Sequence, residues 1–590
     1  MISNDLLRKF LIWRIRHINN KQFLYIVSIL IGLSVGLAAV VIKNSVHFIQ
    51  HLLTSGFSKE YHNYLYFLYP AIGIFIVIIF ANYILKQRIG HGIPSVLYAI
   101  SKNNGQIKRH NMFSSVVSSA LTVGFGGSVG LEGPTVATGA AIGSNIGRLF
   151  HLNYKQIILL LGCACAGAMA AIFKAPIAAI VFALEVIMLD LTMASLVPLL
   201  FASLSAALTS YLFLGQDVLY TFKVVEGFKL SDVPFYIGLG ILTGFVSVYF
   251  TKGYMTIGFF FDKFKSRWTK LAIGGGILGI LIFFFPSLYG EGYAEINSAL
   301  DGNANFLFDR TIFYEFRDNF WVMVVLLILV VIFKVIATSA TFGAGGIGGI
   351  FAPSLFLGAT TGLLFAKVAN SFKFSLPESN FALVGMAGLI AGVIHAPLTA
   401  IFLIAEITDG YSMFVPLMLV STISYATMKL FITNSVYTIQ LAKRGELMTH
   451  DKDKAILSMM SINKMIETNF KTVNVEGNLK NLVEVISNSN RNVIPVIDED
   501  NIFHGIVALD DVRNIMFRPE MYEETQVRNL MFMPIVTVAR EDTMEEVAQK
   551  FQQSGKYVIP VLENGKYLGF VSRANVFSKY RRLLKHFSED

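Results

Sequence analysis

Long apolar segments separated by short polar ones run through the first three quarters of the chain. Five of them reach or approach the length of a membrane span, at residues 24–42, 65–84, 156–173, 234–250 and 321–333. A helix of about 20 apolar residues crosses the hydrocarbon core of a bilayer. Several segments are short or interrupted by glycine, which favours half-spanning helices whose ends face protein or a water-filled cavity. The pattern predicts an all-α, polytopic membrane region.

The pattern changes near residue 448, where charged residues return and the long apolar segments end. We therefore expect an N-terminal segment at 1–22, a membrane domain at 23–447 and a soluble α/β domain at 448–590. The composition agrees with this division, because 54% of the residues are hydrophobic and only 15% are charged. Such values are typical of polytopic membrane proteins.

Basic residues dominate the segment before the first predicted span. They are Arg8, Lys9, Arg14, Arg16 and Lys21, against a single acidic residue, Asp5. The positive-inside rule places this segment in the cytoplasm, and we expect a multi-pass protein of the cell's inner or plasma membrane with both termini cytoplasmic. The segment lacks the cleavage site of a signal peptide, so we expect it to be retained. The net charge of +9 indicates attraction to anionic lipid and predicts no nucleic-acid partner.

The two cysteines, Cys163 and Cys165, are two residues apart in a run of small apolar residues. That spacing suits neither a regular disulfide nor a metal site, so both are interpreted as core residues. The sequence shows no pairing of a nucleophile with a base and no cluster of metal ligands that would indicate catalysis. We therefore predict no enzyme, no metal site and no cofactor in the membrane domain.

A glycine-rich stretch at residues 124–147, GFGGSVGLEGPTVATGAAIGSNIG, contains one carboxylate, Glu132, in an apolar context. A carboxylate at bilayer depth is costly and usually functional. Glycines before a helix let the backbone approach a ligand, and the first N–H groups of the helix attract an anion. Glu132 can compete with a mobile anion for these donors, and protonation removes the competitor, so Glu132 is interpreted as a gate. The structural alternative is a buried carboxylate among glycines that only serve helix packing.

A second copy of this stretch occurs later in the chain. The sequence GLEGPTVATGA at 130–140 aligns with GIFAPSLFLGA at 349–359, and KAPIAAIVFALE at 174–185 aligns with HAPLTAIFLIAE at 395–406. The offset is nearly the same for both pairs, which indicates a duplicated membrane unit. Paired hydrophobic segments interrupted by Gly and Pro predict a site near the bilayer midplane, built from broken helices.

From about residue 20 to 445 the chain resembles the CLC family of chloride channels and anion/proton exchangers. Four motifs occur in the family's order: GHGIP, GLEGP, GIFAP and a tyrosine, Tyr437. The motif positions are Gly90, Gly92, Ile93 and Pro94, then Gly130, Gly133 and Pro134, then Gly349 and Pro353. The resemblance implies an inverted repeat of broken helices, a membrane-embedded homodimer and one anion pathway per subunit.

The resemblance also implies an anion-binding set. A dehydrated anion is held by partial charges, which compensate its lost hydration and still let it leave. The set is His91, Tyr437 and the N–H groups of Ile350 and Phe351. His91 stands where the family usually has serine, so the anion is chloride by family default, with another anion as the alternative. His91 either donates through its ring or turns aside and leaves its backbone N–H to serve.

Two further positions depart from common family patterns. Leu131 replaces the basic residue that often precedes the gating glutamate. Val186 occupies the place where proton-coupled members carry a second glutamate, and valine cannot carry a proton. The coupling position is therefore lost, which favours uncoupled flux.

The soluble domain contains its own repeat, NVIPVIDEDNIFHGIVALDDV at 492–512 and YVIPVLENGKYLGFVSRANV at 557–576. Each copy predicts strand, turn, strand and helix, and together they resemble a CBS pair at about 460–516 and 526–583. Such pairs often bind an adenine nucleotide, for which Asp511 is the candidate ribose contact. The second copy has Asn575 at the matching place, and Ala508 replaces the hydroxyl residue that Ser572 still supplies. The alternative is a structural dimerisation module without a ligand.

Together these features predict a passive channel for chloride or a related small anion, gated by Glu132. One alternative is an anion/proton exchanger of the same fold. The alternative from another class is a membrane-bound receptor that senses nucleotides through its CBS tail.

Overall fold

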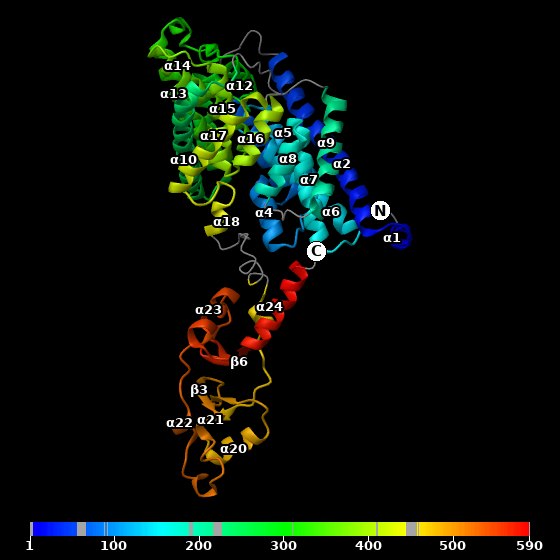
Figure 1. The fold of residues 1–590 in the computed structure, drawn as a ribbon, viewed down its shortest axis with the longest axis vertical. Coiled ribbons are helices and arrows are strands. Elements are labelled where there is room, and N and C mark those ends of the chain that lie inside the picture. The colour runs from blue at the N-terminus through cyan, green and yellow to red at the C-terminus, as the bar shows by residue number, and fades with distance from the viewer. Residues whose placement is uncertain are drawn as a thin grey trace. The chain divides into compact units, whose positions relative to one another are not determined.

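The computed structural model describes residues 4–55, 67–87, 89–90, 92–187, 193–215, 227–309, 311–408, 411–443, 457 and 460–588. The chain forms two compact units, Met1–Leu447 and Met448–Asp590. Figure 1 shows that the first unit is built from helices and that the second combines short helices with small sheets.

The helices of the first unit fall into two series. The first comprises α1 (Asn4–His17), α2 (Asn20–Ser55), α3 (Tyr69–Ile79) with η1 (Phe80–Leu85), α4 (Gly92–Lys102), α5 (Asn111–Gly124), α6 (Glu132–Leu149), α7 (Tyr154–Phe173), α8 (Pro176–Glu185) and α9 (Met193–Leu214). The second comprises η2 (Leu230–Asp232), α10 (Val233–Asp262), α11 (Arg267–Phe284), η3 (Pro286–Leu288), α12 (Tyr293–Leu300), η4 (Asn305–Leu307), η5 (Tyr314–Phe316), α13 (Phe320–Ala344), α14 (Phe351–Ser371), α15 (Glu378–Ile394), α16 (Pro397–Ile407), η6 (Tyr411–Met413), α17 (Phe414–Phe431) and α18 (Ile439–Lys443).

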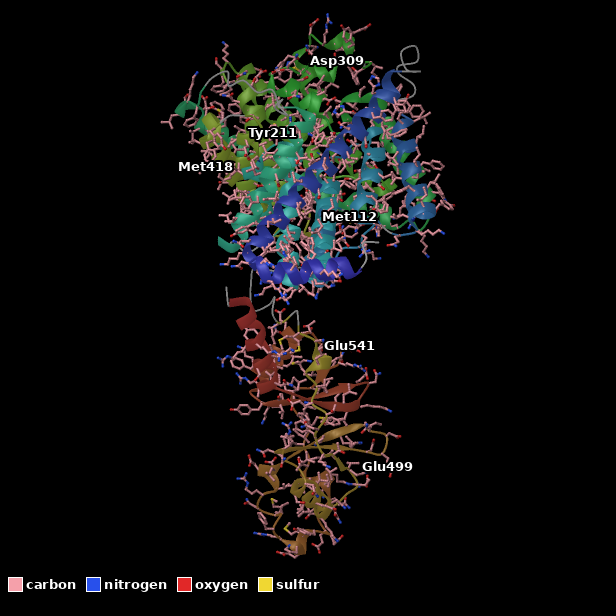
Figure 2. The ribbon with its side chains drawn as sticks, turned by 90° about the vertical axis from the view of Figure 1, so that its right-hand side faces the viewer. Met112, Tyr211, Asp309, Met418, Glu499 and Glu541 are labelled. Atoms are coloured by element: carbon pink, nitrogen blue, oxygen red, sulfur yellow. The ribbon has the colours of Figure 1, made fainter. Side chains whose placement is uncertain are left out.

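The predicted spans lie within helices of this unit. The segments 24–42, 156–173, 234–250 and 321–333 fall in α2, α7, α10 and α13, while 65–84 begins outside the described residues and continues through α3 and η1. Eight helices of the described part are long and apolar enough to cross a membrane. Side chains fill the space between them (Figure 2), and this core includes the two free cysteines.

The two series repeat each other in their packing. Helix α6 packs on α7 as α14 packs on α15, and α2 packs on α9 as α10 packs on α17. The breaks between helices repeat as well. Lys174 ends α7 and His395 ends α15, both with left-handed backbone at φ 57° and 61°. Each is followed by Ala-Pro, and the proline opens the next short helix, where its fixed φ and missing N–H are tolerated.

A reciprocal contact joins the two short helices that follow these breaks. The Glu185 carboxylate, at the end of α8, accepts hydrogen bonds from the N–H groups of Leu398 and Thr399 at 3.2 and 2.8 Å. The Glu406 carboxylate, in the last turn of α16, accepts them from Ile177 and Ala178 at 3.1 and 2.8 Å. Each carboxylate thus satisfies unpaired donors at the positive end of the other helix.

The second unit consists of two similar halves. The first contains η7 (Ile462–Lys464), β1 (Val473–Asn474), α20 (Leu479–Ser487), β2 (Val493–Ile497), β3 (Phe503–Ala508) and α21 (Leu509–Val512), followed by η8 (Pro519–Met521) and α22 (Val527–Leu530). The second contains β4 (Val538–Ala539), α23 (Met544–Ser554), β5 (Val558–Glu563), β6 (Lys566–Ser572) and α24 (Arg573–Ser588). In each half a short parallel strand joins an antiparallel hairpin, in the orders β1-β2-β3 and β4-β5-β6. The predicted strand, turn and strand repeat is confirmed.

We expect the reciprocal carboxylates to stabilise the first unit. Glu185→Gln and Glu406→Gln each replace charge-assisted hydrogen bonds to helix N-termini by weaker neutral ones, and each should lower stability by about 1–2 kcal/mol. Thermal unfolding of the detergent-solubilised protein measures this loss. Glu315→Gln is the matched control, because Glu315 is exposed. Equal unfolding midpoints for all three variants would show that the contacts contribute nothing.

Candidate functional site

The loops that precede α6 and α14 meet in an antiparallel bridge. The Gly130 N–H donates to the Gly349 carbonyl at 2.8 Å, and the Gly349 N–H donates to the Gly130 carbonyl at 2.7 Å. Two threonines brace the bridge in the same reciprocal way. Thr122 Oγ1 accepts the N–H of Ile347 at 3.0 Å, and Thr341 Oγ1 accepts the N–H of Ser128 at 3.2 Å.

Glycine is required where these loops touch. A Cβ on Gly349 would lie 2.7 Å from the nitrogen of Gly133, which is closer than side chains tolerate. Gly92, at the start of α4, has φ 54°, and a Cβ there would lie 3.4 Å from Gly133. The N-termini of α4, α6 and α14 therefore converge. Unpaired N–H groups and the positive ends of three helix dipoles favour an anion at this point.

The Glu132 carboxylate lies at this convergence and is 0% exposed. Its Oε1 accepts a hydrogen bond from the Tyr293 hydroxyl at 2.9 Å, while its Oε2 is buried and has no hydrogen-bond partner in the part of the chain that the structure describes. Oε2 fills the space that a Cβ on Gly130 would need. The carboxylate is also close to its own backbone N–H and to that of Ala352 in α14. Glu132 thus interacts with backbone donors of two helices.

Three members of the predicted anion-binding set, Tyr437, Ile350 and Phe351, lie near this point. Tyr437 is buried, its hydroxyl has no hydrogen-bond partner, and it is near enough to Glu132 to feel its charge. Ile350 precedes α14 and Phe351 opens it, so their N–H groups belong to the unpaired end of that helix. Phe351 is buried against Phe173, with ring centroids 5.2 Å apart. His91 lies outside the described residues.

The segment 289–293, which we call the clasp, was not predicted. The Tyr289 ring occupies the space that a Cβ on Gly126 would need, and the Gly290 N–H donates to the Gly126 carbonyl at 3.2 Å. Tyr293, at the other end of the clasp, donates to Glu132. The clasp therefore holds the loop before α6 on one side and the Glu132 carboxylate on the other.

Sequence reasoning also missed three charged residues near Glu132. The Glu291 carboxylate, in the clasp, interacts with the N–H of Leu131, and its Oε1 is buried without a hydrogen-bond partner. Lys334 in α13 is 0% exposed, and its Nζ donates to the Gly290 carbonyl at 3.3 Å. Lys43 in α2 donates to the Ile172 carbonyl at 2.9 Å. A lysine in a long apolar segment is itself a signal of function that could have identified Lys334.

The position of Val186 accords with an apolar role. It caps the C-terminus of α8 through its N–H, which donates to the Phe182 carbonyl at 2.9 Å, and its side chain is buried. No proton carrier stands at this place.

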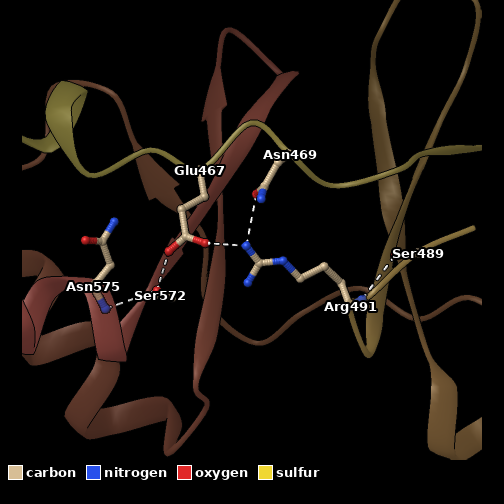
Figure 3. A network of polar contacts seen from close by, with 6 residues as sticks. All are labelled: Glu467, Asn469, Ser489, Arg491, Ser572 and Asn575. Atoms are coloured by element: carbon tan, nitrogen blue, oxygen red, sulfur yellow. Dashed lines mark hydrogen bonds and ion pairs between the residues drawn. The ribbon is translucent and has the colours of Figure 1, made fainter.

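The predicted ribose contact of the first copy, Asp511, and the hydroxyl residue of the second copy, Ser572, differ in their surroundings. Asp511 in α21 is exposed. In the second half the Ser572 hydroxyl donates to Glu467, and the same carboxylate accepts a hydrogen bond from Arg491 at 2.9 Å (Figure 3). Arg491 also contacts Asn469 at 3.0 Å. Ser572, the hydroxyl residue that the CBS resemblance predicts near a ribose, therefore already bonds a carboxylate of the chain.

Comparison with known proteins identifies both units. A model of the voltage gated chloride channel family matches residues 72–429, and a model of the CBS domain matches residues 462–518 and 527–582. A relative in Ralstonia nicotianae, named as a ClcB-like chloride channel protein, is 30% identical over 64% of this chain and 86% of its own length. A relative in Vibrio cholerae, named H(+)/Cl(-) exchange transporter ClcA, is 29% identical over 67% of this chain and 84% of its own length.

Solved structures share the fold. A slow cyanobacterial Cl-/H+ antiporter aligns with a TM-score of 0.61 at 22% identity, over 72% of this chain and 98% of its own. A eukaryotic CLC transporter aligns with a TM-score of 0.60 at 17% identity, over 94% of this chain and 97% of its own. The predicted fold class and family resemblance are confirmed. The chain is a multi-pass membrane protein of the voltage gated chloride channel (CLC) family that carries a pair of CBS domains.

Proposed function

We propose that this protein exchanges a small anion for protons, with Glu132 as the group that links the two fluxes. The supporting observation is the position of the Glu132 carboxylate, which is fully buried beside backbone donors of α6 and α14. An anion that enters the site needs the same donors. Carboxylate and anion therefore compete, and only one of them is held there at a time.

Protonation resolves this competition. A neutral Glu132 no longer needs the helix N-termini, so it leaves them to the anion. When the anion departs, the donors are again unpaired, and the ionised carboxylate returns to them. The Tyr437 hydroxyl has no hydrogen-bond partner among the described residues, and together with the N–H groups of Ile350 and Phe351 it offers neutral donors to the anion on its way. Each cycle then moves protons one way and anions the other.

The relatives favour exchange over the passive channel that the sequence favoured. Several carry the name H(+)/Cl(-) exchange transporter, and one neighbouring structure is described as a CLC-type fluoride/proton antiporter. Chloride is the default substrate on this basis. His91, the unusual residue of the GHGIP motif, is the position that we expect to tune selectivity, since its size and its charge both differ from those of serine.

A passive channel remains the second candidate, and Val186 is the observation that favours it. The buried valine provides no side chain at position 186 that can carry a proton. In that case Glu132 responds to pH without coupling the two fluxes.

The same proposal includes the rest of the assembly. The protein is a homodimer in the cell's inner or plasma membrane, with one pathway per subunit and with both termini in the cytoplasm. The CBS pair tunes the flux, because every residue that we assign to the anion pathway lies in the first unit.

Exchange predicts uphill proton movement in liposomes that contain the full-length protein. Chloride is loaded inside, an outward chloride gradient is imposed and the membrane potential is clamped with potassium ionophore. Internal pH should then fall as protons enter at a fixed ratio to the chloride that leaves. Glu132→Gln is the matched control, and it should retain chloride efflux while proton entry stops. Chloride efflux without proton entry in the unmodified protein would exclude exchange and leave the channel.

In the CBS pair we expect Glu467 to lower the affinity for a nucleotide. Its carboxylate accepts the hydrogen bond of the Ser572 hydroxyl, which is then not free to meet a ribose. Glu467→Ala should therefore raise the affinity for ATP by about tenfold, because the ribose no longer competes with a charged hydrogen-bond acceptor for the Ser572 hydroxyl. Calorimetry with the full-length protein measures this change, with the exposed Glu499→Ala as the control. If neither variant binds ATP more tightly than the unmodified protein, or if no heat of binding is seen, only the structural role of this unit would be left.

A further inference from the structure

A polar pocket lies between the helices α4, α5 and α6 of the first unit. Its volume is about 150 Å³, which is room for several water molecules. The exposed side chains of Asn103, Gln106 and Lys108, in the loop between α4 and α5, form the mouth of the pocket. Gly90, the first residue of the GHGIP motif, and Ala137 of α6 belong to the same wall. The pocket therefore reaches from the surface of the unit to the GHGIP motif.

The mouth of this pocket lies at the end of the unit that carries α1. A Cβ on Gly105, in the loop between α4 and α5, would lie 3.2 Å from Ile157 near the start of α7. Phe150, just before α7, packs against Phe10 of α1 with ring centroids 6.1 Å apart. Figure 1 shows α1 and the loop that follows α4 at the same end of the first unit. With the N-terminus in the cytoplasm, as proposed above, the mouth faces the cytoplasm.

Two polar atoms in the wall of the pocket lack a hydrogen-bond partner. Asn111 and Ser115 of α5 both line the pocket, and Asn111 Oδ1 and Ser115 Oγ are buried with no partner among the described residues. Ser115 is 1% exposed. Such atoms are costly unless water meets them, and a polar cavity of this size holds water. Lys108 is the one charged side chain among the described residues that line the pocket.

Hydrogen bonds from α6 hold the wall of the pocket in place. Ser144 Oγ donates to the Gly105 carbonyl at 2.6 Å and accepts the N–H of Ile107 at 3.0 Å. Asn145 Nδ2 donates to the Ile107 carbonyl at 3.2 Å. The loop between α4 and α5 is therefore fixed to α6, so the pocket does not close by collapse of this loop.

The inner end of the pocket approaches the residues around Glu132. Ser95 of α4 lines the pocket, and its Oγ donates to the Gly92 carbonyl at 2.7 Å. A Cβ on Gly92 would lie 3.4 Å from Gly133, the residue that follows Glu132 in α6. One backbone contact between α4 and α6 thus separates the wall of the pocket from the start of α6.

A row of hydroxyl groups continues from the pocket along α5. Ser115, Ser118 and Thr122 are three and four residues apart, so they share one face of the helix. Ser118 is 0% exposed, and its Oγ has no hydrogen-bond partner in the part of the chain that the structure describes. Thr122 Oγ1 accepts the N–H of Ile347 and so braces the bridge at Gly130, where Glu132 Oε2 lies. Polar groups therefore lead from the pocket to this bridge.

We propose that the pocket is a water-filled inlet through which cytoplasmic protons reach the bridge beside Glu132. The proposal deepens the proposed function and rests on the exchange of anions for protons. A proton moves through such water as one O–H bond forms and the next one breaks. The proton that leaves at the inner end is replaced from solution at the mouth, so the charge of the inlet does not change. The inlet supplies protons by a route that does not involve Val186.

Thiol accessibility tests whether the inlet holds water. Ser115→Cys places a thiol in the wall of the pocket of the full-length protein. A small charged methanethiosulfonate that does not cross membranes is added to the cytoplasmic or to the external side of membrane vesicles. From the cytoplasmic side it should modify this thiol at least about tenfold faster than the thiol of Ala120→Cys, because thiols react where solvent reaches them.

Ala120 is the matched control because it lies on the same helix, is 4% exposed and does not line the pocket. The natural cysteines, Cys163 and Cys165, are 0% exposed, so the unmodified protein gives the background. Equal rates for Ser115→Cys and Ala120→Cys, or modification from the external side alone, would overturn the proposal.

The modified protein then tests proton supply. The attached group fills the pocket, so the ratio of proton entry to chloride efflux in liposomes should fall. A reductant that releases the group should restore the ratio in the same sample, which excludes misfolding as the cause. An unchanged ratio after complete modification would overturn the proposal. If Ser115→Cys fails to fold, Ala137→Leu fills the pocket from α6 and should lower the same ratio, and an unchanged ratio there is equally contrary.

Failure of the inlet and failure of exchange give different results. Chloride efflux without proton entry in the unmodified protein would refute exchange. Thiol accessibility would still decide by itself whether the pocket is open to cytoplasmic water.

Discussion

A dehydrated anion at membrane depth needs donors that compensate its charge without trapping it, and the rest of this structure depends on how those donors are supplied. They come from helices that begin inside the membrane unit. The bridge between Gly130 and Gly349 joins the loops just before the N-termini of two of these helices, α6 and α14. The reciprocal contacts of Thr122 and Thr341, and of the two carboxylates that end α8 and α16, fix the same arrangement farther out. Duplication of one unit thus creates paired helix ends.

Buried charge is the second constraint. The Glu132 carboxylate has no exposed surface and is tolerated because helix N-termini, the Tyr293 hydroxyl and the positive charge of Lys43 interact with it. Lys334 is equally buried and binds the clasp through a backbone carbonyl, so it compensates charge and positions Glu291 at once. A group of two carboxylates and two ammonium groups changes its net charge with each proton, which makes it suited to link anion movement to pH.

Most of the membrane fold could be predicted from the sequence, because its motifs occur twice and each carries a backbone requirement. The glycines of GLEGP and GIFAP mark a close approach that only glycine permits, and the Ala-Pro pairs mark helix breaks. The clasp could not be predicted, because the residues that it contacts in the loop before α6 and at Glu132 lie more than 150 positions away in the sequence. The Ser572 contact with Glu467 could not be predicted either, because Glu467 lies outside the repeated strands.

In the proposed function the Glu132 carboxylate occupies a place that an anion can take. Calorimetric titration of the detergent-solubilised protein with chloride at neutral pH tests this most directly, with Glu132→Gln as the comparison. If the carboxylate competes with the anion, the glutamine variant should bind chloride about tenfold more tightly, or bind an additional chloride per subunit. Equal affinity and equal stoichiometry in the two proteins would contradict the competition on which the account rests.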